Sequence, residues 1–368
     1  GKEHDSHSQN WQAYLLQIGM EILNKKDELS MAFEYARGRG MPYYSYSQEE
    51  KLIEFEKIKR ANFKNGIEGN EVLQLLHGLG LAWSYFPHHW EVQVLKMRRP
   101  IDVYKDDKLL KKALASRIKF GGKVGLNGFM TDANLRKAIR TASGVQAVSN
   151  FRPAAAASIY HKFSKNGVVW DMSCGYGGRL IGALASGCVK KYIGTDPCKL
   201  TYEGLQKIKD DFSHIKMDVE INMVGSENFV PNEEIDLCFT SPPYFNTEEY
   251  SNEQSQSWKK YPTKKEWLHG FLRNTMKNCY RCLKDEGLMV LNIANVKTYP
   301  NLETDVLRMA YMEQFKVQDI LLLRLSSIMG GFKYEPIFIF KKNNDEKPCE
   351  HCKKQIKKPL ILCDECEN

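Results

Sequence analysis

The chain has 368 residues, about twice the length of a usual domain, so more than one folded unit is expected. Hydrophobic residues make up 42% and charged residues 27%, which excludes disorder for the bulk of the chain. No apolar run approaches the roughly 18 residues of a membrane helix, and the polar first residues do not resemble a secretory signal. We therefore expect a soluble, cytoplasmic protein without membrane contacts, and the sequence leaves its oligomeric state open.

The positive charge of the chain is concentrated in one segment. The net charge is +8, whereas residues 92–140 contain thirteen Lys and Arg against four Asp. Such a surplus is typical of a surface that faces a polyanion, although a solvated helix face is the simpler alternative. The candidate phosphate contacts in this segment are Arg98, Arg99, Lys108, Lys111 and Lys112.

Helical patterns dominate the first 148 residues. They cover Gln9 to about Gly38, then Ser47 to Asn62, which starts with a capping-box-like Ser-x-x-Glu, and finally Glu71 to His77, stopped by Gly78. His88 and His89 lack a Cys or acidic partner at metal-ligand spacing, so we expect them to pack rather than to bind a metal. Residues 1–148 are thus predicted to form a mainly helical, basic region.

From Gly167 onward short apolar runs alternate with helical ones. The predicted strands are Val168 to Trp170, Lys191 to Gly194, Val219 to Met223, Ile235 to Phe239, Leu288 to Ile293, Val317 to Leu325 and Glu335 to Phe340. Buried strands separated by crossover helices, one of them a long helix from Lys264 to Leu283, predict an α/β fold with a mainly parallel sheet. The last two strands are joined only through Met329-Gly330-Gly331, so they should pair antiparallel. Seven strands with a reversed final hairpin resemble the class I methyltransferase fold, which is Rossmann-like.

Two strand ends carry residues suited to a nucleoside ligand. The first strand ends in Asp171-Met-Ser173-Cys-Gly175-Tyr-Gly177-Gly-Arg, a glycine-rich turn that lets backbone approach a ligand. The second ends in Asp196-Pro197, and a carboxylate there can accept both hydroxyls of a ribose. Ser226 and Glu227 follow the third strand and are placed on the adenine side. These features alone fit a nicotinamide dinucleotide as well as S-adenosylmethionine.

The fourth strand stops at Ser241-Pro242-Pro243-Tyr244, where two prolines force a rigid turn at the ligand-binding edge of the sheet. Here the chain resembles the exocyclic-amino DNA methyltransferases, whose signature is Asp/Asn/Ser-Pro-Pro-Tyr. Acceptors from Ser241 Oγ and the Pro242 carbonyl can hold the two hydrogens of a poorly nucleophilic base amine while Tyr244 stacks on the base. The base must be single-stranded or leave its stack to reach this turn.

The resemblance covers Ser149 to about Lys342, is closest to phage-type and bacterial members, and includes Asn150-Phe151-Arg152-Pro153 before the first strand. It implies a methyltransferase domain over residues 149–342, DNA as the partner and catalysis by Ser241, Pro242, Pro243 and Tyr244. It also implies a bacterial or phage-infected host cell, a restriction-modification setting, and target recognition by residues 1–148. The implied S-adenosylmethionine contacts are Phe151, Arg152, Asp171, Ser173, Gly175, Gly177, Asp196, Pro197, Ser226 and Glu227.

The family also guides the choice of target. Serine before the two prolines occurs more often with cytosine N4 as the target than with adenine N6, so cytosine N4 is the expected site. Adenine N6, RNA, an already modified base, or a non-catalytic nucleic-acid-binding role remain the alternatives. A carbon-5 cytosine enzyme would need a Pro-Cys pair after the fourth strand. Pro197-Cys198 follows the second strand instead, so Cys198 is expected to be structural.

Three further residues have less specific patterns. Trp258 and Tyr261 follow the catalytic turn in a Ser/Asn/Gln-rich segment and are hypothesised to close over the base. Arg179, at the start of a predicted helix, is equally suited to a phosphate, to the cofactor carboxylate or to an exposed surface.

Four of the ten cysteines cluster at the end of the chain, as Cys349-x2-Cys352 and Cys363-x2-Cys366. Two such pairs bring four thiolates to one tetrahedral Zn²⁺, so residues 343–368 are predicted to form a structural zinc ribbon. Two disulfides are the alternative, which an intracellular location disfavours. Cys279-x2-Cys282 has similar spacing but lies in a helical pattern without a second pair, so we expect a buried helix face there.

Overall fold

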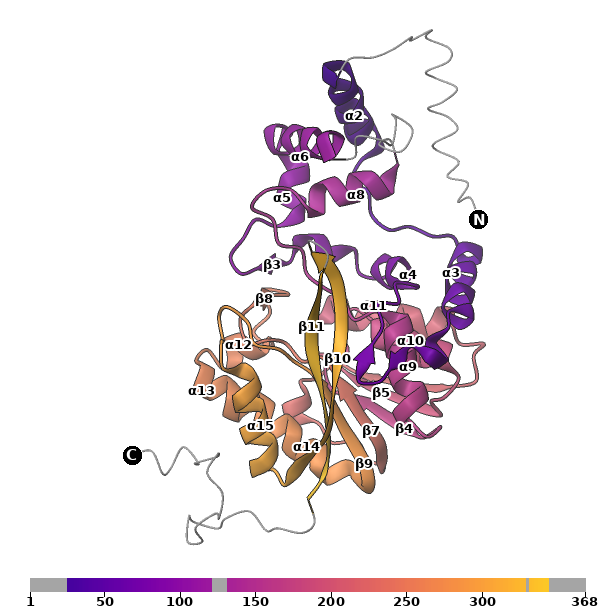
Figure 1. Cartoon of the computed structure of the whole chain (residues 1–368), viewed down its shortest axis with the longest axis vertical. Coiled ribbons are helices and arrows are strands. Elements are labelled where there is room, and N and C mark those ends of the chain that lie inside the picture. The colour runs from indigo at the N-terminus through magenta and orange to yellow at the C-terminus, as the bar shows by residue number, and fades with distance from the viewer. Residues whose placement is uncertain (1–24, 121–130, 329–330, 344–368) are drawn as a thin grey trace. The chain divides into compact units, whose positions relative to one another are not determined.

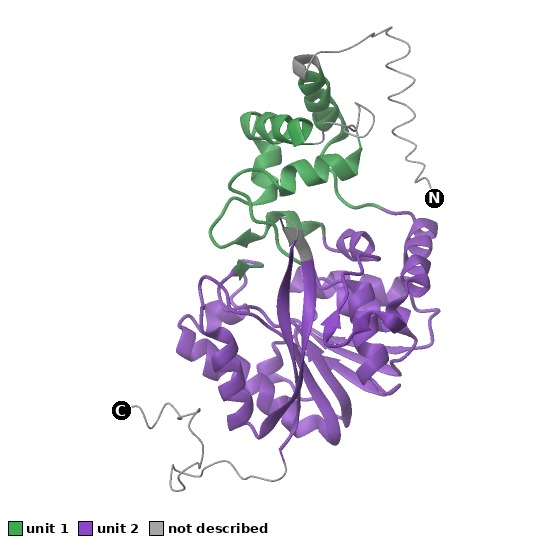
Figure 2. Ribbon diagram, in the orientation of Figure 1, with its two compact units in different colours: residues 1–45, 87–149, 248–250 green, residues 46–86, 150–247, 251–368 purple. Residues whose placement is uncertain are grey.

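The structure is a computed structural model that describes residues 25–120, 131–328 and 331–343 (Figure 1). The chain divides into two compact units (Figure 2). Unit 1 comprises Gly1–Ser45, Pro87–Ser149 and Glu248–Tyr250, and unit 2 comprises Tyr46–Phe86, Asn150–Thr247 and Ser251–Asn368. The predicted change at residues 148–149 coincides with a passage between the units, but residues 46–86 group with unit 2. The cysteines of the predicted zinc ribbon lie outside the described residues.

Unit 1 is built mainly from short helices. They are α2 (Lys25–Arg39), the 3-10 helix η2 (Pro87–Glu91), α5 (Pro100–Lys105), α6 (Asp107–Phe120) and α8 (Asp132–Arg140). Their apolar sides enclose a small core that includes Tyr35, Trp90, Leu110 and Ile139. A two-stranded antiparallel pair, β3 (Gln93–Val94) and β8 (Glu248–Glu249), completes the unit. Of these helices, α2 lies within the helix predicted from Gln9 to about Gly38, whereas no individual helices were predicted at the other segments.

Unit 2 contains a sheet of nine strands in the order β1-β2-β10-β11-β9-β7-β4-β5-β6. Seven of them are β4 (Val168–Asp171), β5 (Lys191–Thr195), β6 (Asp218–Asn222), β7 (Ile235–Thr240), β9 (Leu283–Asn292), β10 (Phe315–Ile328) and β11 (Gly331–Lys342). β11 pairs antiparallel with both β9 and β10, whereas β4, β5, β6, β7 and β9 are joined by parallel pairs. This is the strand arrangement of the class I methyltransferase fold, which confirms the predicted fold class.

The sheet exceeds the predicted seven strands because β1 (Ile67–Glu68) and β2 (Glu71–Val72) are added at its edge. The helix expected from Glu71 to His77 was therefore wrong. Glu71 and Val72 pair in parallel with Leu322 and Leu323 of β10, and the Glu71 carboxylate accepts hydrogen bonds from Arg324 and Tyr334. The next helix, α4 (Leu79–Ser84), begins only after Gly78, which has a left-handed φ of 84°. Pairing with a distant strand overrides the local helical pattern here.

Two further helical segments begin where the sequence pattern predicts them. α3 (Gln48–Arg60) starts with a complete capping box between Ser47 and Glu50. The long predicted helix after Lys264 is assembled from α13 (Lys264–Glu266), the π-helix η4 (Trp267–Arg273) and α14 (Asn274–Cys282). The remaining helices that pack on the sheet are α9 (Pro153–Phe163), α10 (Gly178–Ser186), α11 (Lys199–Asp211) and α15 (Leu302–Met312).

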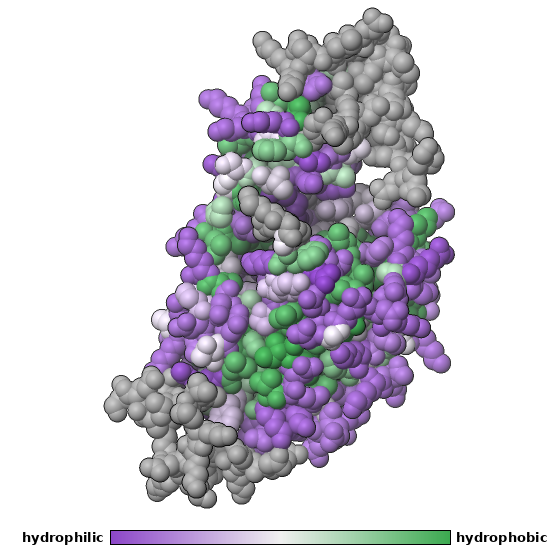
Figure 3. Space-filling view, viewed as in Figure 1, coloured by the Kyte–Doolittle hydropathy of each residue, from purple (hydrophilic) through white to green (hydrophobic). Residues whose placement is uncertain are grey.

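Helices cover both faces of the sheet (Figure 1). Consecutive residues of β7 point to opposite faces of the sheet, and each of them packs against a helix. The Phe239 ring packs 5.3 Å from the Tyr160 ring of α9, whereas Cys238 joins a buried cluster with Cys279 and Met276 of α14. The hairpin of β10 and β11 is less well covered. Val317, Ile320, Phe332 and Tyr334 of β10 and β11 are exposed, and Figure 3 shows hydrophobic side chains gathered on this face.

Candidate active site

The glycine-rich turn is anchored by a buried ion pair. Asp171, the last residue of β4, has no exposed surface and lies 2.9 Å from Arg179 Nε. Its carboxylate also accepts hydrogen bonds from Tyr192 OH at 2.6 Å and Thr240 Oγ1 at 2.7 Å. Arg179 is 4% exposed, so it is neither a surface residue nor placed to reach a phosphate. Asp171 thus contacts the turn and the neighbouring strands rather than facing solvent.

The turn itself requires glycine. Gly175 and Gly177 have φ of 54° and 70°, in the left-handed region that side chains disfavour. A Cβ on Gly178 would lie 1.8 Å from the carbonyl oxygen of Phe151, so the segment before α9 passes directly against the start of α10. Phe151 is buried, and its ring packs edge-on 5.5 Å from Phe239. The motif before the first strand therefore supports the turn through packing.

Asp196 is the acidic group that faces this turn. Its carboxylate accepts the N–H of Gly175 and the N–H of Cys198, each at 3.0 Å, and Pro197 beside it is half-buried. Burial raises the pKa of Asp196 to about 6, against the two backbone hydrogen bonds that lower it. Two backbone donors leave lone pairs on both oxygens, and hydroxyl donors would favour the ionised form. Asp196 therefore fits the ribose of a nucleoside cofactor.

The residues after β6 are tied to α14. Ser226 is buried, and its hydroxyl lies 2.8 Å from Thr275 Oγ1. Asn278 Nδ2 donates to the carbonyl oxygens of Ser226 and Glu227 at 3.0 and 3.1 Å. The Glu227 side chain is 4% exposed and pairs with Lys260 Nζ at 2.7 Å. The Glu227–Lys260 pair has no signal in the sequence.

The segment after the Ser241–Tyr244 turn makes further contacts beside Asp196 and with Glu227. Besides Lys260, Glu253 accepts the N–H of Lys199 at the start of α11, at 3.3 Å, and Ser255 Oγ donates to the carbonyl of Pro197 at 3.3 Å. We name residues 253–260 the strap. It contacts Pro197, which follows Asp196, and Glu227 itself.

The Ser241–Tyr244 turn follows β7, as predicted. Ser241, Pro243 and Tyr244 are half-buried and Pro242 is buried. The next residue, Phe245, has a left-handed φ of 56°, and its buried ring packs 5.9 Å from Trp267 and 6.3 Å from Tyr299. Such a backbone conformation costs about 1–3 kcal/mol at a bulky residue and persists only where packing holds it. Phe245 thus anchors the turn in the core.

Hydrogen bonds of Thr240 join the glycine-rich turn to the end of β7. β4 and β7 are parallel neighbours, so their carboxyl ends meet at one edge. Thr240, the last residue of β7, accepts the N–H of Ser173 at 3.1 Å and donates to Asp171. The predicted cofactor and catalytic residues are thereby brought together.

Other predicted residues lie further from this edge or pack differently. Arg152 Nη1 donates to the carbonyl of Arg324 at 2.7 Å, and burial lowers its pKa. Trp258 and Tyr261 are partly buried against the α14 core, with Tyr261 packed so closely on Gly270 that a Cβ there would lie 2.4 Å from its ring. Cys198 is buried at the N-cap of α11, in agreement with a structural role.

Sequence reasoning missed one group at this edge. Tyr244 OH donates toward the carbonyl oxygen of Asn292 at 3.3 Å and lies 3.5 Å from Glu335 Oε2 on β11. In the sequence pattern Glu335 is only the first residue of a predicted strand. No local pattern links positions 244 and 335, so only the sheet register could have found the pair.

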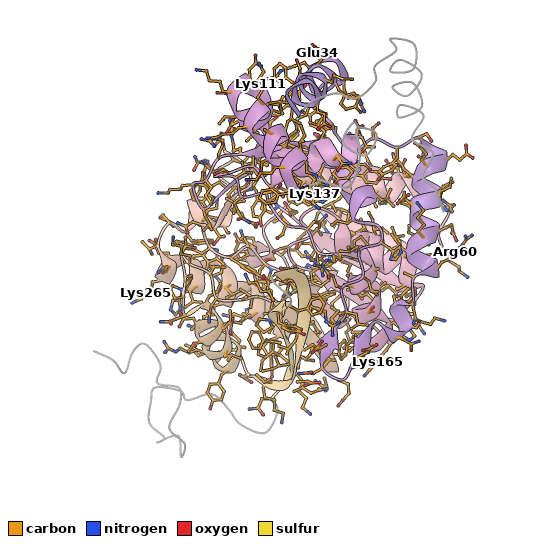
Figure 4. The ribbon with its side chains drawn as sticks, turned by 45° about the horizontal axis from the view of Figure 1, so that its top comes forward. Glu34, Arg60, Lys111, Lys137, Lys165 and Lys265 are labelled. Carbon is orange, nitrogen blue, oxygen red and sulfur yellow. The ribbon has the colours of Figure 1, made fainter. Side chains whose placement is uncertain are left out.

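The candidate phosphate contacts belong to unit 1 and differ in their surroundings. Lys108, Lys111 and Lys112 are exposed on α6. Lys111, which is labelled in Figure 4, also has its Nζ 4.3 Å from the Phe33 ring centroid. Arg98 is exposed and bonds the carbonyl of Ser143, whereas Arg99 is held by two hydrogen bonds to Asp102 at 2.7 and 2.9 Å. The Arg99 charge is therefore largely matched within the protein.

The part of the chain that the structure describes contains neither a cluster of metal ligands nor a helix that could span a membrane. No group of three or more His, Cys, Asp or Glu there could hold a metal ion. His89 is buried against Trp90, with 4.9 Å between ring centroids, which agrees with the packing expected for it. No helix in the described ranges is long and apolar enough to span a membrane. Cys349, Cys352, Cys363 and Cys366 lie outside these ranges.

Comparison with known proteins bears on the same region. Residues 235–360, about a third of the chain, match a family model of N6/N4 methyltransferases described as DNA methylase. A search of curated proteins found no match.

Several solved structures are similar to the chain. An S-adenosylmethionine-dependent methyltransferase from Clostridium acetobutylicum shows 10% identity and a TM-score of 0.36, over 48% of this chain and 85% of that one. A TehB-like methyltransferase from Corynebacterium glutamicum shows 16% identity and a TM-score of 0.34, over 53% and 89%. A methyltransferase from Methanosarcina mazei shows 12% identity and a TM-score of 0.37, over 50% and 96%.

The strand order and the family match are independent of each other and agree. Unit 2 has the class I methyltransferase fold, and the segment from β7 through β11 matches the DNA methylase family. Together they support S-adenosylmethionine as the cofactor and methyl transfer as the chemistry.

Proposed function

We propose that the protein transfers a methyl group from S-adenosylmethionine to the exocyclic N4 amine of cytosine in DNA. The observation that carries this proposal is the hydrogen bond between the glycine-rich turn and the last residue of β7. Ser173 of the glycine-rich turn is hydrogen-bonded to Thr240, the residue before Ser241, so the cofactor and base sites share one sheet edge.

The reaction needs positioning more than acid–base chemistry, because the base amine is a weak nucleophile. When bound, S-adenosylmethionine supplies an electrophilic methyl group on a sulfonium. Asp196 holds the ribose hydroxyls through its carboxylate. Ser241 Oγ and the Pro242 carbonyl accept the two amine hydrogens, and Tyr244 stacks on the base. These contacts align the amine with the methyl group, and alignment of two reactants supplies a large part of a rate enhancement.

The choice of cytosine rests on Ser241. In the family that the sequence resembles, serine at this position occurs more often with cytosine N4, whereas Asp or Asn is usual for adenine N6. Incubating DNA with the protein and tritiated cofactor, followed by digestion to nucleosides, tests the choice. We expect the label in N4-methylcytosine. Label in N6-methyladenine would overturn the choice of base, label only in RNA would overturn DNA as substrate, and cofactor binding without transfer would indicate a non-catalytic module.

We further propose that the basic region, residues 1–148, contacts DNA phosphates, mainly through Lys108, Lys111 and Lys112 of α6, with Arg98. Each phosphate contact changes the slope of log affinity against log salt by about −0.9 on duplex DNA. Replacing Lys108 and Lys112 together by Ala should flatten the slope by up to about 2 at unchanged cofactor affinity. Replacing Arg99, whose charge is matched by Asp102, should change it less. An unchanged slope in the double lysine variant would overturn this role of α6.

The zinc ribbon of residues 343–368 stays part of the proposal, because the spacing of Cys349, Cys352, Cys363 and Cys366 matches a four-thiolate site. Elemental analysis of dialysed protein should find about one zinc per chain. Metal-free protein with these four thiols reduced would contradict it.

A further inference from the structure

Glu335 lies at the catalytic edge of the sheet although it belongs to the reversed strand. In the antiparallel pairing of β11 with β9, Ile337 is opposite Asn292, the last residue of β9. Glu335 comes two residues earlier in β11, so it extends on the same face just beyond the end of β9. Its Oε2 lies 3.5 Å from Tyr244 OH, which also contacts the carbonyl oxygen of Asn292 at 3.3 Å.

The surroundings of Glu335 are unfavourable for a carboxylate without donors. The side chain is half-buried, and the strand continues through the buried residues Ile337, Phe338, Ile339 and Phe340. Burial raises the pKa of Glu335, while the nearby charges of Lys333 and Arg152 and hydrogen bonds from Asn292 and Tyr244 lower it. A carboxyl group in such a place is stable only where hydrogen bonds compensate it, and Tyr244 is one of the donors.

We propose that Glu335 is a positioning residue that orients Tyr244 for stacking on the target base. This inference rests on the proposed function of Ser241–Tyr244. The single hydroxyl hydrogen of Tyr244 lies near two acceptors, the Asn292 carbonyl at 3.3 Å and the Glu335 carboxylate at 3.5 Å, and donation to either one restrains the ring before the base arrives. Without Glu335 the Tyr244 ring must become ordered when the base binds. This ordering costs free energy of binding, because the ring is no longer pre-organised.

The test compares single and double variants in single-turnover methyl transfer. Glu335→Ala and Tyr244→Phe should each lower the transfer rate about tenfold, as expected for loss of a hydrogen bond to a charged group. The double variant should lose no more than Tyr244→Phe alone, because Glu335 acts through the hydroxyl that Tyr244→Phe already removes. Glu335→Gln retains an acceptor oxygen and should recover most of the rate. S-adenosylmethionine affinity should not change in any of these variants.

The chain offers a matched control. Tyr334 OH of β11 and Glu71 of β2 form the same kind of contact at 3.3 Å, and neither residue belongs to the Ser241–Tyr244 turn. Glu71→Ala and Tyr334→Phe should leave the transfer rate unchanged. Three results would overturn the positioning role. They are equal loss of rate in both pairs, additive losses of Glu335→Ala and Tyr244→Phe, and no rescue by Glu335→Gln.

A second measurement separates this inference from the proposed function. With 3-fluorotyrosine incorporated, the ¹⁹F signal of Tyr244, assigned through Tyr244→Phe, should shift or broaden in Glu335→Ala and stay near wild type in Glu335→Gln. If the wild-type protein transfers no methyl group, the proposed function fails, and the ¹⁹F signal still decides whether Glu335 orients the ring. An identical signal in wild type and Glu335→Ala would overturn the inference even in an active enzyme.

Discussion

The two halves of the site in unit 2 are stabilised in different ways. On the cofactor side, Asp171 is buried with Arg179, Tyr192 and Thr240, and its carboxylate receives a hydrogen bond from each of them. On the base side, the Ser241–Tyr244 turn is held by packing of Phe245 and by long hydrogen bonds of 3.3 and 3.5 Å from Tyr244. Charges that are fixed in advance can bind a cofactor of constant shape. A base that enters from a nucleic acid instead needs contacts that tighten when it binds. We therefore expect the cofactor half to be rigid and the base half to be adjustable.

The largest effect should come from breaking the buried ion pair. Arg179→Met leaves Asp171 charged, buried and unpaired, which typically costs about 3–5 kcal/mol of unfolding free energy. Urea denaturation measures the loss. Arg273→Met is the matched control, because its pair with Glu313 is partly exposed and should contribute less than about 1 kcal/mol. Similar losses in the two variants would show that the cofactor half is not specially stabilised.

Asp196 should control cofactor affinity alone. Asp196→Ala removes charge-assisted hydrogen bonds to the ribose, so we expect about 1.5–3 kcal/mol weaker binding in calorimetry. Its stability should change less than that of Arg179→Met, since Asp196 pairs only with the backbone N–H groups of Gly175 and Cys198. Unchanged cofactor affinity would contradict its placement in the cofactor site.

The raised pKa of Asp196 predicts the pH dependence of cofactor binding. Below its pKa of about 6 in the free protein the carboxyl is protonated and accepts hydroxyl donors poorly, so affinity should fall about tenfold per pH unit. The same raised pKa makes the carboxyl's contribution to stability greatest below the unfolded pKa and lost as pH rises through about 6. Asp196→Asn should bind more weakly and without this pH dependence. A pH profile of Asp196→Asn that matches wild type would assign the titration to another group.

A change at Tyr244 should affect the base half of the site and leave the cofactor half unchanged. Tyr244→Ala removes base stacking, which is worth about 1–3 kcal/mol per base, so kcat/KM for DNA should fall about 5- to 150-fold at unchanged cofactor affinity. Tyr334→Ala, an exposed tyrosine on β11, serves as the control. Equal loss of cofactor binding and turnover in Tyr244→Ala would mean that the turn supports both halves.

The smallest effect should come from the strap that connects the halves. Lys260→Met breaks the pair with Glu227, and we expect S-adenosylmethionine affinity to weaken by about 1.5- to 5-fold, as for a partly exposed ion pair. Lys259→Met is the neighbouring control, because Lys259 Nζ donates to the carbonyl of Asn252, just before the strap, rather than to Glu227. Equal affinities of the two variants would show that the strap has no part in cofactor binding.

Features that depend on local chemistry could be predicted from the sequence. Apolar runs bounded by glycine and proline located the seven strands of the methyltransferase sheet, and the capping box before α3 marked where that helix begins. The turns that carry Gly175, Asp196 and Ser241 were likewise placed correctly at strand ends, because glycine allows turn conformations and proline restricts the backbone wherever they occur.

Tertiary structure alone decided the features that depend on distant partners. Glu71 and Val72 follow a helical pattern, yet they form a strand because β10, about 250 residues later, presents an open edge. Arg179 is buried because Asp171 compensates its charge, and Glu335 faces Tyr244 because the reversed strand β11 extends past the end of β9. In each case the free energy comes from a contact between residues far apart in the chain, which no periodicity or local motif encodes.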